Sequence, residues 1–263
     1  MDRRNRPIAV FDSGVGGISV LKALVRRLSA ERFVYLGDTA HAPYGPRPTA
    51  EIRRLTLENL RALDEAEPFK AAVIACNTAT SAAIEELRRT YPDRPVVGIE
   101  PALKPAADRH PGRTVLVLAT ETTLREAKYA ALAERMGSRC TVVSLPCPEL
   151  VEFVERGETD SPALEAWLRV RLAPWLARPI GAVVLGCTHF PFASGALRRV
   201  LPPGTELIDG SDGTARQTAR LLAEADLLRP ESAPGEVVFR STSPDPAAVA
   251  QMERLFRGES ETE

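Results

Sequence analysis

Short apolar runs alternate with longer amphipathic stretches along most of this chain. The runs are rich in Val, Ile, Leu and Ala, which is typical of parallel strands that are buried on both faces. The stretches between them repeat apolar residues at the spacing of one helix face. The pattern therefore predicts an α/β fold with mainly parallel sheets. The predicted strands are 8–11, 33–36, 72–75, 95–99, 114–119, 141–144, 182–185, 206–209 and 237–239.

Helices are predicted between these strands. The clearest is the amphipathic stretch 49–66. The others are expected at 20–28, from 81 onward, and at 124–135, 149–157, 161–172, 214–223 and 247–256. The pattern restarts near residue 114, so two similar α/β halves are expected, and in each half a cysteine, Cys76 or Cys187, follows the third strand. Because open α/β sheets bind ligands at the carboxyl ends of their strands, both thiols should lie at binding edges.

The composition narrows the range of partners. With 44% hydrophobic and 26% charged residues, the chain of 263 residues is of the ordinary globular type. A net charge of -1 gives no reason to expect nucleic acid or an anionic membrane as a partner. No apolar run is long enough to span a bilayer, and the stretch 1–7 is charged, so we expect a cytoplasmic protein. The stretch 258–263 is expected to be a disordered acidic tail.

The chain has four cysteines, and no two of them form a C-x-x-C pair. They are Cys76, Cys140, Cys147 and Cys187. With three histidines and no ligand-like spacing, the sequence does not support a zinc site, and we expect no bound metal. In a cytosolic chain the thiols should be reduced, and a redox dithiol would more often be a C-x-x-C pair. The structural alternative is that these thiols are small buried hydrophobes.

A glycine-rich turn, DSGVGG at 12–17, stands between the first predicted strand and its helix. It has neither the G-x-G-x-x-G spacing of a dinucleotide site nor the Lys of a P-loop, and Asp12 would repel a phosphate. A small ligand that carries both a carboxylate and an ammonium suits the turn better, with Asp12 meeting the ammonium or relaying a proton. The structural alternative is a tight turn capped by Asp12 or Ser13.

The second cysteine turn is Gly186-Cys187-Thr188-His189. A histidine beside a cysteine at the start of a helix is typical of a reactive thiolate, and His189 can exchange protons near neutral pH. The structural alternative is a buried histidine that only satisfies hydrogen bonds.

Two cysteines at matching places do not fit a hydrolase, which needs one nucleophile, one base and an oxyanion hole. They fit a two-base reaction, in which one thiolate removes a proton from carbon and the opposite thiol delivers one. The carbanion between them would need hydrogen bonds placed in advance in a dry site. Residue types suited to hold carboxylates stand nearby, namely Ser13, Asn77, Thr78 and Thr188.

Four motifs together resemble the aspartate/glutamate racemase family. They are VFDSGVGG at 10–17, GDT at 37–39 with PYG at 43–45, CNTA at 76–79 and GCTH at 186–189. The resemblance covers most of the chain, and the stretches 77–80 and 188–191 are more similar to the glutamate enzymes of the family than to the aspartate enzymes. It implies a cofactor-independent racemase with two pseudo-symmetric α/β domains and an active site in the cleft between them. We expect the first domain at 1–98 plus 210–263 and the second at 99–209.

The resemblance also implies roles for single residues. Cys76 and Cys187 match the two catalytic thiols, with Cys76 acting on the α-proton of D-glutamate and Cys187 on that of L-glutamate. Asp12 would assist Cys76, and His189 would assist Cys187. The product D-glutamate would supply peptidoglycan synthesis, and hence the cell wall and cell shape. A homodimer is compatible with the resemblance.

Two further assignments rest on the same resemblance. Glu155 matches another acidic residue of the family, although Glu152 is close enough to leave that assignment open. The matched substrate-contacting positions are Asp12, Ser13, Tyr44, Gly45, Asn77, Thr78, Thr188 and His189.

Two alternatives to a glutamate racemase are kept, and a third is disfavoured. An aspartate or broad-specificity racemase would use the same motifs. A catalytically silent ligand-binding protein on the same fold would keep the binding residues without turnover. A pyridoxal enzyme would need a Schiff-base lysine, and none of the four lysines lies in these motifs.

Overall fold

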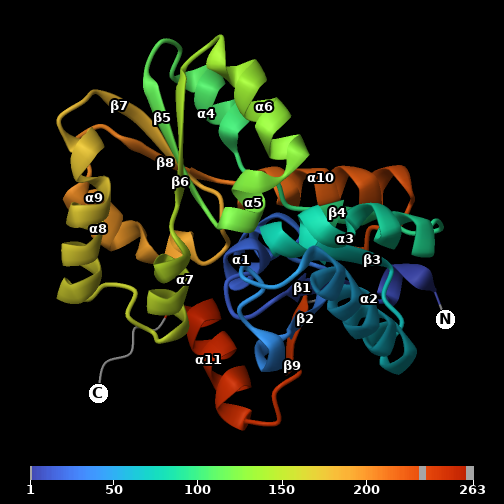
Figure 1. The fold of residues 1–263 in the computed structure, drawn as a ribbon. Helices are drawn as coiled ribbons and strands as arrows, with labels where there is room; N and C mark the ends of the chain where they lie inside the picture. Colours follow the sequence, from blue (N-terminus) through green and yellow to red (C-terminus); the bar gives the residue numbers. More distant parts are fainter. Residues whose placement is uncertain (1, 231–234, 259–263) are drawn as a thin grey trace. The chain divides into compact units, whose positions relative to one another are not determined.

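The computed structural model describes residues 2–230 and 235–258 (Figure 1). The chain forms two compact units, one comprising Met1–Glu100 with Ser211–Glu263 and the other Pro101–Gly210. Each unit is a parallel sheet with helices packed on it, so the predicted α/β class is confirmed. The predicted acidic tail lies, from residue 259 onward, outside the described residues.

The first unit is built on a five-stranded parallel sheet with the order β4-β3-β1-β2-β9. Its strands are β1 (Ile8–Asp12), β2 (Arg32–Gly37), β3 (Ala71–Ile74), β4 (Val96–Gly98) and β9 (Glu236–Ser241). Its helices are η1 (Arg3–Asn5), α1 (Ile18–Arg27), η2 (Thr39–His41), α2 (Thr49–Ala66), α3 (Asn77–Thr90), α10 (Ser211–Glu224) and α11 (Pro246–Arg257). Every residue of β1 and β3 is buried, because the sheet packs against helices such as α2 and α3.

The second unit has a four-stranded parallel sheet with the order β6-β5-β7-β8. Its strands are β5 (Thr114–Ala119), β6 (Thr141–Pro146), β7 (Ile180–Leu185) and β8 (Glu206–Asp209). Its helices are α4 (Leu103–Arg109), α5 (Glu121–Arg125), α6 (Ala127–Gly137), α7 (Pro148–Glu155), α8 (Pro162–Leu176), η3 (Phe190–Ala193) and α9 (Ser194–Val200). Two apolar clusters form its core: one joins the sheet to α7, α8 and α9, and the other joins it to α4 and α6.

The two sheets share one strand order. When the strands of each unit are counted along the chain, both sheets read 2-1-3-4, and β9 is added beside β2 in the first unit. The register pairs Asp12 with Gly37 and Ile74 with Gly98, so the carboxyl ends of β1 to β4 lie along one edge. Cys76 follows the third strand of its sheet, β3, and Cys187 follows the third strand of the other, β7.

One predicted helix is wrong in its extent. The stretch 124–135 belongs to two helices, α5 and α6, rather than to one. The side chain of Thr120 accepts a hydrogen bond from the backbone N–H of Thr123 and starts a short helix there. The extended backbone of Glu126 ends this helix, and a second helix begins at the next residue. The short helices α4 and α9 were not predicted.

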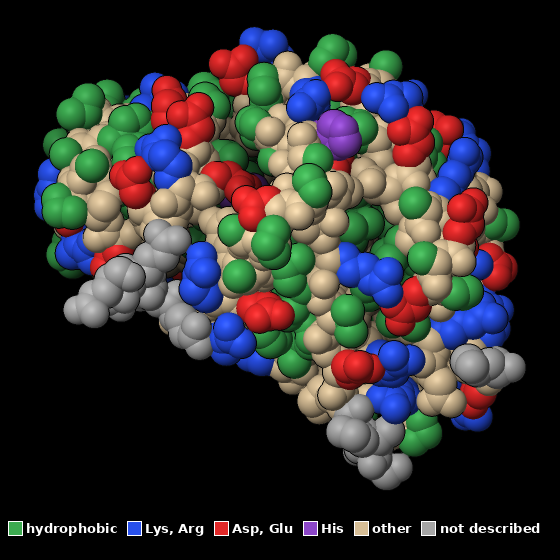
Figure 2. Space-filling model, turned by 90° about the horizontal axis from the view of Figure 1, so that it is seen from below, with side chains coloured by type: hydrophobic (Ala, Val, Ile, Leu, Met, Phe, Trp, Pro, Cys, Tyr) green, Lys and Arg blue, Asp and Glu red, His purple; other side chains and the backbone are tan. Residues whose placement is uncertain are grey.

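The surface carries both signs of charge. On the face drawn in Figure 2, Lys and Arg side chains are interspersed with Asp and Glu side chains. Among the described residues, no helix combines the length and the apolar character needed to cross a bilayer.

Candidate functional site

Cys76 stands at the junction of strand β3 and helix α3, where it is the N-cap residue of the helix. Its sulfur accepts a hydrogen bond from the backbone N–H of Ala79 at 3.4 Å and lies 3.5 Å from the hydroxyl oxygen of Ser13. Unpaired N–H groups and the helix dipole favour negative charge at this position. The local fold therefore stabilises a thiolate at Cys76.

The glycine-rich turn holds Ser13 against that thiol. Asp12, fully buried at the end of β1, accepts a hydrogen bond on Oδ2 from the backbone N–H of Gly14 at 2.9 Å. Gly17 allows the close approach, because a Cβ there would lie 2.7 Å from Cβ of Asp12 and 2.9 Å from Cβ of Ala75. The tight turn considered as the structural alternative is thus present, although helix α1 has Gly17 as its N-cap and no side-chain cap. The turn is also what brings the candidate site residues together.

Asn77 and Thr78 form the first turn of α3, and both are buried. Asn77 is 5% exposed, and its Oδ1 is a buried oxygen without a hydrogen-bond partner among the described residues. Such an oxygen is costly unless a ligand supplies the donor. Oδ1 is an acceptor, so it is suited to the ammonium of a ligand rather than to its carboxylate.

Tyr44 lies in the loop that follows η2 and is 1% exposed. Its hydroxyl donates to Oδ2 of Asp38 at 2.6 Å. Burial, together with this hydrogen bond, raises the pKa of Tyr44, so the phenol stays protonated. The next residue, Gly45, is partly exposed. The sequence motif contained Asp38 but gave it no role, because its partners are set by the fold.

In the second unit, Cys187 lies in the turn after β7. Its sulfur is 3.6 Å from Nδ1 of His189, and Nε2 of His189 is 2.5 Å from Oε1 of Glu155 at the end of α7. Gly186 permits the turn to pass close to β5, since a Cβ there would lie 2.9 Å from the carbonyl oxygen of Leu118. The sequence Cys-Thr-His and the last turn of α7 thus form a chain of thiol, imidazole and carboxylate.

The charge state of His189 follows from its partners. Burial disfavours the charged imidazole, but the hydrogen bonds with Cys187 and Glu155 outweigh it and raise the pKa of His189 well above its usual value. The raised pKa favours an imidazolium beside the sulfur of Cys187. Glu152 does not take part: its side chain is 64% exposed and lies 3.8 Å from Arg156. The contact with His189 is therefore made by Glu155.

The structure brings the predicted residues together within each unit. In the first unit, the carboxyl edge of the sheet carries Asp12, Ser13, Cys76, Asn77 and Thr78, with the loop of Tyr44 and Gly45 after β2. In the second unit, Cys187, Thr188 and His189 follow β7, and Glu155 joins them through His189.

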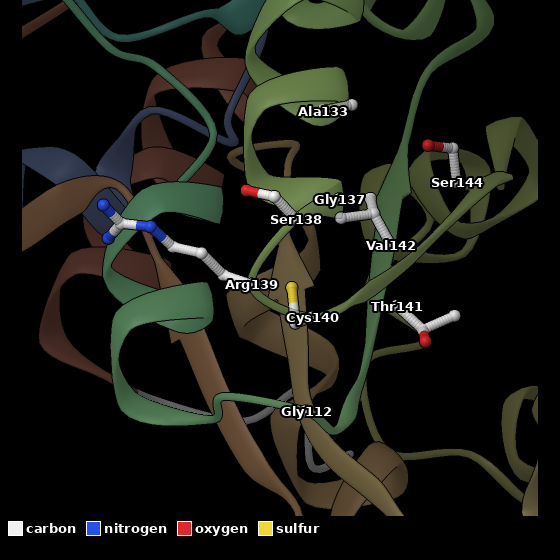
Figure 3. A pocket seen from close by; sticks show the side chains of 9 residues that line it. All are labelled: Gly112, Ala133, Gly137, Ser138, Arg139, Cys140, Thr141, Val142 and Ser144. Atoms are coloured by element: carbon white, nitrogen blue, oxygen red, sulfur yellow. The ribbon is translucent and has the colours of Figure 1, made fainter.

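The other two cysteines lie elsewhere. Cys147 is buried before α7, and burial raises its pKa to about 11. Cys140 lines a pocket of about 560 Å³ between α6 and β6 (Figure 3). In this view the side chain of Arg139 extends away from the others, and it pairs with Asp108. None of the predicted site residues lines this pocket.

No metal site stands out in the described part of the chain. Within residues 2–230 and 235–258, no group of three or more His, Cys, Asp or Glu side chains is placed to hold a metal ion.

Comparison with known proteins defines the class. The family model for Asp/Glu/hydantoin racemases matches residues 8–218, which is most of the chain. The chain belongs to this racemase family, as the four motifs predicted.

Its similar relatives include several named glutamate racemases. The chain is 41% identical to glutamate racemase of Clostridium botulinum over 256 residues, covering 97% of this chain and 99% of that one. It is 45% identical to that of Clostridium kluyveri over 243 residues, covering 92% and 94%.

Solved structures of glutamate racemases are also similar to this chain. Glutamate racemase of Thermus thermophilus, in complex with β-chloro-D-alanine, matches with a TM-score of 0.80 and 39% identity over 97% of this chain and 94% of that one. The Escherichia coli enzyme, in complex with L-glutamate and the activator UDP-MurNAc-Ala, matches with a TM-score of 0.83 and 34% identity over 96% and 95%.

Proposed function

We propose that this protein interconverts L- and D-glutamate without an added cofactor, using Cys76 and Cys187 as opposed acid/base thiols. One observation carries the proposal: each thiol follows the third strand of its own sheet and has polar partners there, namely the N-terminus of α3 for Cys76 and the imidazole of His189 for Cys187. The names of the relatives support glutamate as the substrate.

The reaction balances without an oxidant or a reductant. From L-glutamate, the Cys187 thiolate takes the α-proton, and the electron pair of the broken C–H bond stays on the α-carbon. The Cys76 thiol then gives its proton to the opposite face of that carbon. The product is D-glutamate, and the two cysteines have exchanged protonation states. In the other direction, Cys76 removes the proton and Cys187 delivers it.

Each thiol has a neighbour that assists it in this proposal. His189, which is hydrogen-bonded to Glu155, balances the charge that Cys187 loses and gains when it accepts and releases a proton. Asp12 assists Cys76 from the adjacent turn, where Ser13 contacts the sulfur. A buried carboxylate and an imidazole at the two ends of the reaction keep both thiols ready for proton transfer.

The remaining residues hold the substrate. The ammonium is met by two buried acceptors, Asp12 and Oδ1 of Asn77. The hydroxyls of Thr78 and Thr188, together with the loop at Gly45, bind the carboxylates. Fixing these charges in a site that excludes water lowers the cost of forming the carbanion.

We further propose that the reaction takes place in the cytoplasm and supplies D-glutamate for peptidoglycan synthesis. The similarity to the Escherichia coli enzyme, whose structure contains the activator UDP-MurNAc-Ala, supports this link.

A circular-dichroism assay tests the proposal. The purified protein, without pyridoxal phosphate, should bring the signals of L-glutamate and D-glutamate to zero. Faster turnover of aspartate than of glutamate would instead indicate an aspartate or broad-specificity racemase. Binding of glutamate without any change in the signal would indicate a silent binding protein and contradict the proposal.

A further inference from the structure

Asp38 is a buried carboxylate in the first unit, directly after β2, and is 0% exposed. Three side chains contact it. The hydroxyl of Tyr44 donates to Oδ2 at 2.6 Å, the hydroxyl of Thr242 donates to Oδ1 at 2.6 Å, and Nδ1 of His41 lies 2.8 Å from Oδ1. Contacts this short to a carboxylate belong to the strong class of hydrogen bond, and together they hold the side chain of Asp38 in one orientation.

The partner Thr242 comes from the other end of the chain, 204 positions later. It follows β9, which runs parallel to β2 at the edge of the sheet (Figure 1). The backbone N–H of Thr242 donates to the carbonyl of Gly37 at 3.1 Å, and its hydroxyl accepts from the N–H of Ala40 at 3.1 Å. Through these two hydrogen bonds, Thr242 at the end of β9 fixes the start of the loop that leads to Tyr44.

The same residue adjoins the candidate site. The backbone N–H of Asp38 donates to the carbonyl of Asp12 at 2.9 Å. The side chain of Tyr44 is turned inward onto Asp38, so the loop can offer its backbone near Gly45 to a ligand. Asp38 is itself fully buried, so it acts on the ligand only through its neighbours.

We propose that Asp38, completed by Thr242, is a positioning residue that fixes the loop 42–46 against the substrate and so sets the affinity for glutamate. This inference rests on the proposed function. An amide at position 38 is a poorer anchor, because it offers one acceptor oxygen instead of two and so cannot accept from the hydroxyls of both Tyr44 and Thr242 as the carboxylate does. The loop would then lose its anchor while the two thiols keep their surroundings.

The chain contains a matched control at the opposite end of the same strand. Glu31 precedes β2, is 2% exposed and is also a carboxylate held by several donors. Nζ of Lys70 lies 2.5 Å from its Oε2, and the backbone N–H of Arg229 donates to Oε1 at 2.9 Å. Glu31→Gln should lower stability as Asp38→Asn does, but without touching the loop.

The test compares Asp38→Asn, Thr242→Val, Thr242→Ser and Glu31→Gln with the wild type in steady-state racemisation and thermal unfolding. Loss of a charge-assisted anchor should raise KM for glutamate about tenfold or more in Asp38→Asn, with kcat changed by less than about threefold. Thr242→Val should raise KM by about threefold, whereas Thr242→Ser keeps the hydroxyl and the wild-type KM. Glu31→Gln should lower Tm and leave KM unchanged.

Two results would overturn the inference. An unchanged KM in Asp38→Asn, with the same fall in Tm as Glu31→Gln, would show that the carboxylate only supports the fold. If Asp38→Asn does not fold, equal KM values for Thr242→Val and Thr242→Ser would lead to the same conclusion. An inactive wild type would refute the proposed function itself, whereas an active wild type with an unchanged KM in the variants would refute only the role of Asp38.

Discussion

The two candidate thiols occupy the same place in two sheets, yet their surroundings differ. The sulfur of Cys76 contacts neutral groups, namely the N-terminus of helix α3 and the hydroxyl of Ser13, and the carboxylate of Asp12 lies in the adjacent turn. Cys187 lies beside a titratable chain of His189 and Glu155. Backbone dipoles act at every pH, whereas an imidazole acts only while it holds its proton. One topological position thus carries two different sets of neighbours, and the two cysteines should respond differently to mutation and pH.

The largest effect is expected when either thiol is removed. Cys76→Ser and Cys187→Ser should each lower racemisation by about 10²–10⁴-fold, because a hydroxyl is a much poorer proton-transfer group. Exchange of the α-deuterium of each enantiomer should show which thiol serves which face. Cys140→Ser is the control, since Cys140 lies at a separate pocket, and should keep wild-type activity. Wild-type turnover in both single variants would refute the two-thiol mechanism.

Removing the imidazole of His189 should have the next largest effect. It should slow proton transfer at Cys187 more than proton transfer at Cys76. His189→Asn is expected to lower kcat/KM by roughly 10²-fold. Since the equilibrium constant of a racemase is one, kcat/KM must fall equally in both directions. The asymmetry should appear in the deuterium isotope effect, which should rise more for L-glutamate, the substrate assigned to Cys187. Equal isotope effects for the two enantiomers would contradict the assigned faces.

Substitutions of the two neighbouring glutamates, Glu155 and Glu152, should have smaller and unequal effects on activity. Glu155→Gln removes the charge that holds the imidazolium and should lower kcat about tenfold. Glu152→Gln is the matched control on the same helix, and its activity should stay within about twofold of the wild type, because an exposed side chain paired with Arg156 contributes little. Steady-state assays of the two variants side by side are sufficient. A greater loss in Glu152→Gln would reverse the assignment.

The smallest effect concerns stability and pH. The folded-state pKa of His189 is raised above its unfolded value, so the folded protein binds this proton more tightly. The resulting stabilisation is fully present below the unfolded pKa of about 6.5 and is lost as pH rises through the folded pKa. The difference in free energy of unfolding between wild type and His189→Asn should therefore shrink in urea titrations as the pH rises above about 6.5 and through the folded-state pKa. A difference that grows with pH would contradict the raised pKa.

Local pattern predicted much of the fold. The helix 49–66 and the strands 114–119 and 206–209 were predicted with the bounds that the structure has, because the helix has a clear apolar period and the strands are short runs between turn residues. The break at Glu126 was missed, since an apolar repeat continues across it and only the cap at Thr120 shortens the first helix. The short helices α4 and α9 offer too few turns for a period to be recognised.

The part of the site that depends on contacts between residues far apart in the sequence could not be predicted. Cys76 and Cys187 could be singled out because each follows a strongly apolar strand. Glu155 and Glu152 could not be separated, since they stand one turn apart on one helix and differ only in what each faces. The partnership of Asp38 with Thr242 spans 204 positions and depends on β9 pairing with β2, which no local pattern encodes.

The unpaired Oδ1 of Asn77 also has a consequence for selectivity and for inhibitor design. On the proposed pose, an amino acid gives this oxygen an N–H donor. A 2-oxo acid of the same length would place a carbonyl oxygen there, so that two acceptors would face each other in a buried site. The protein would then discriminate against the keto acids that surround glutamate in metabolism without any steric contact. A ligand meant to occupy this site needs a hydrogen-bond donor at that atom before it needs greater size.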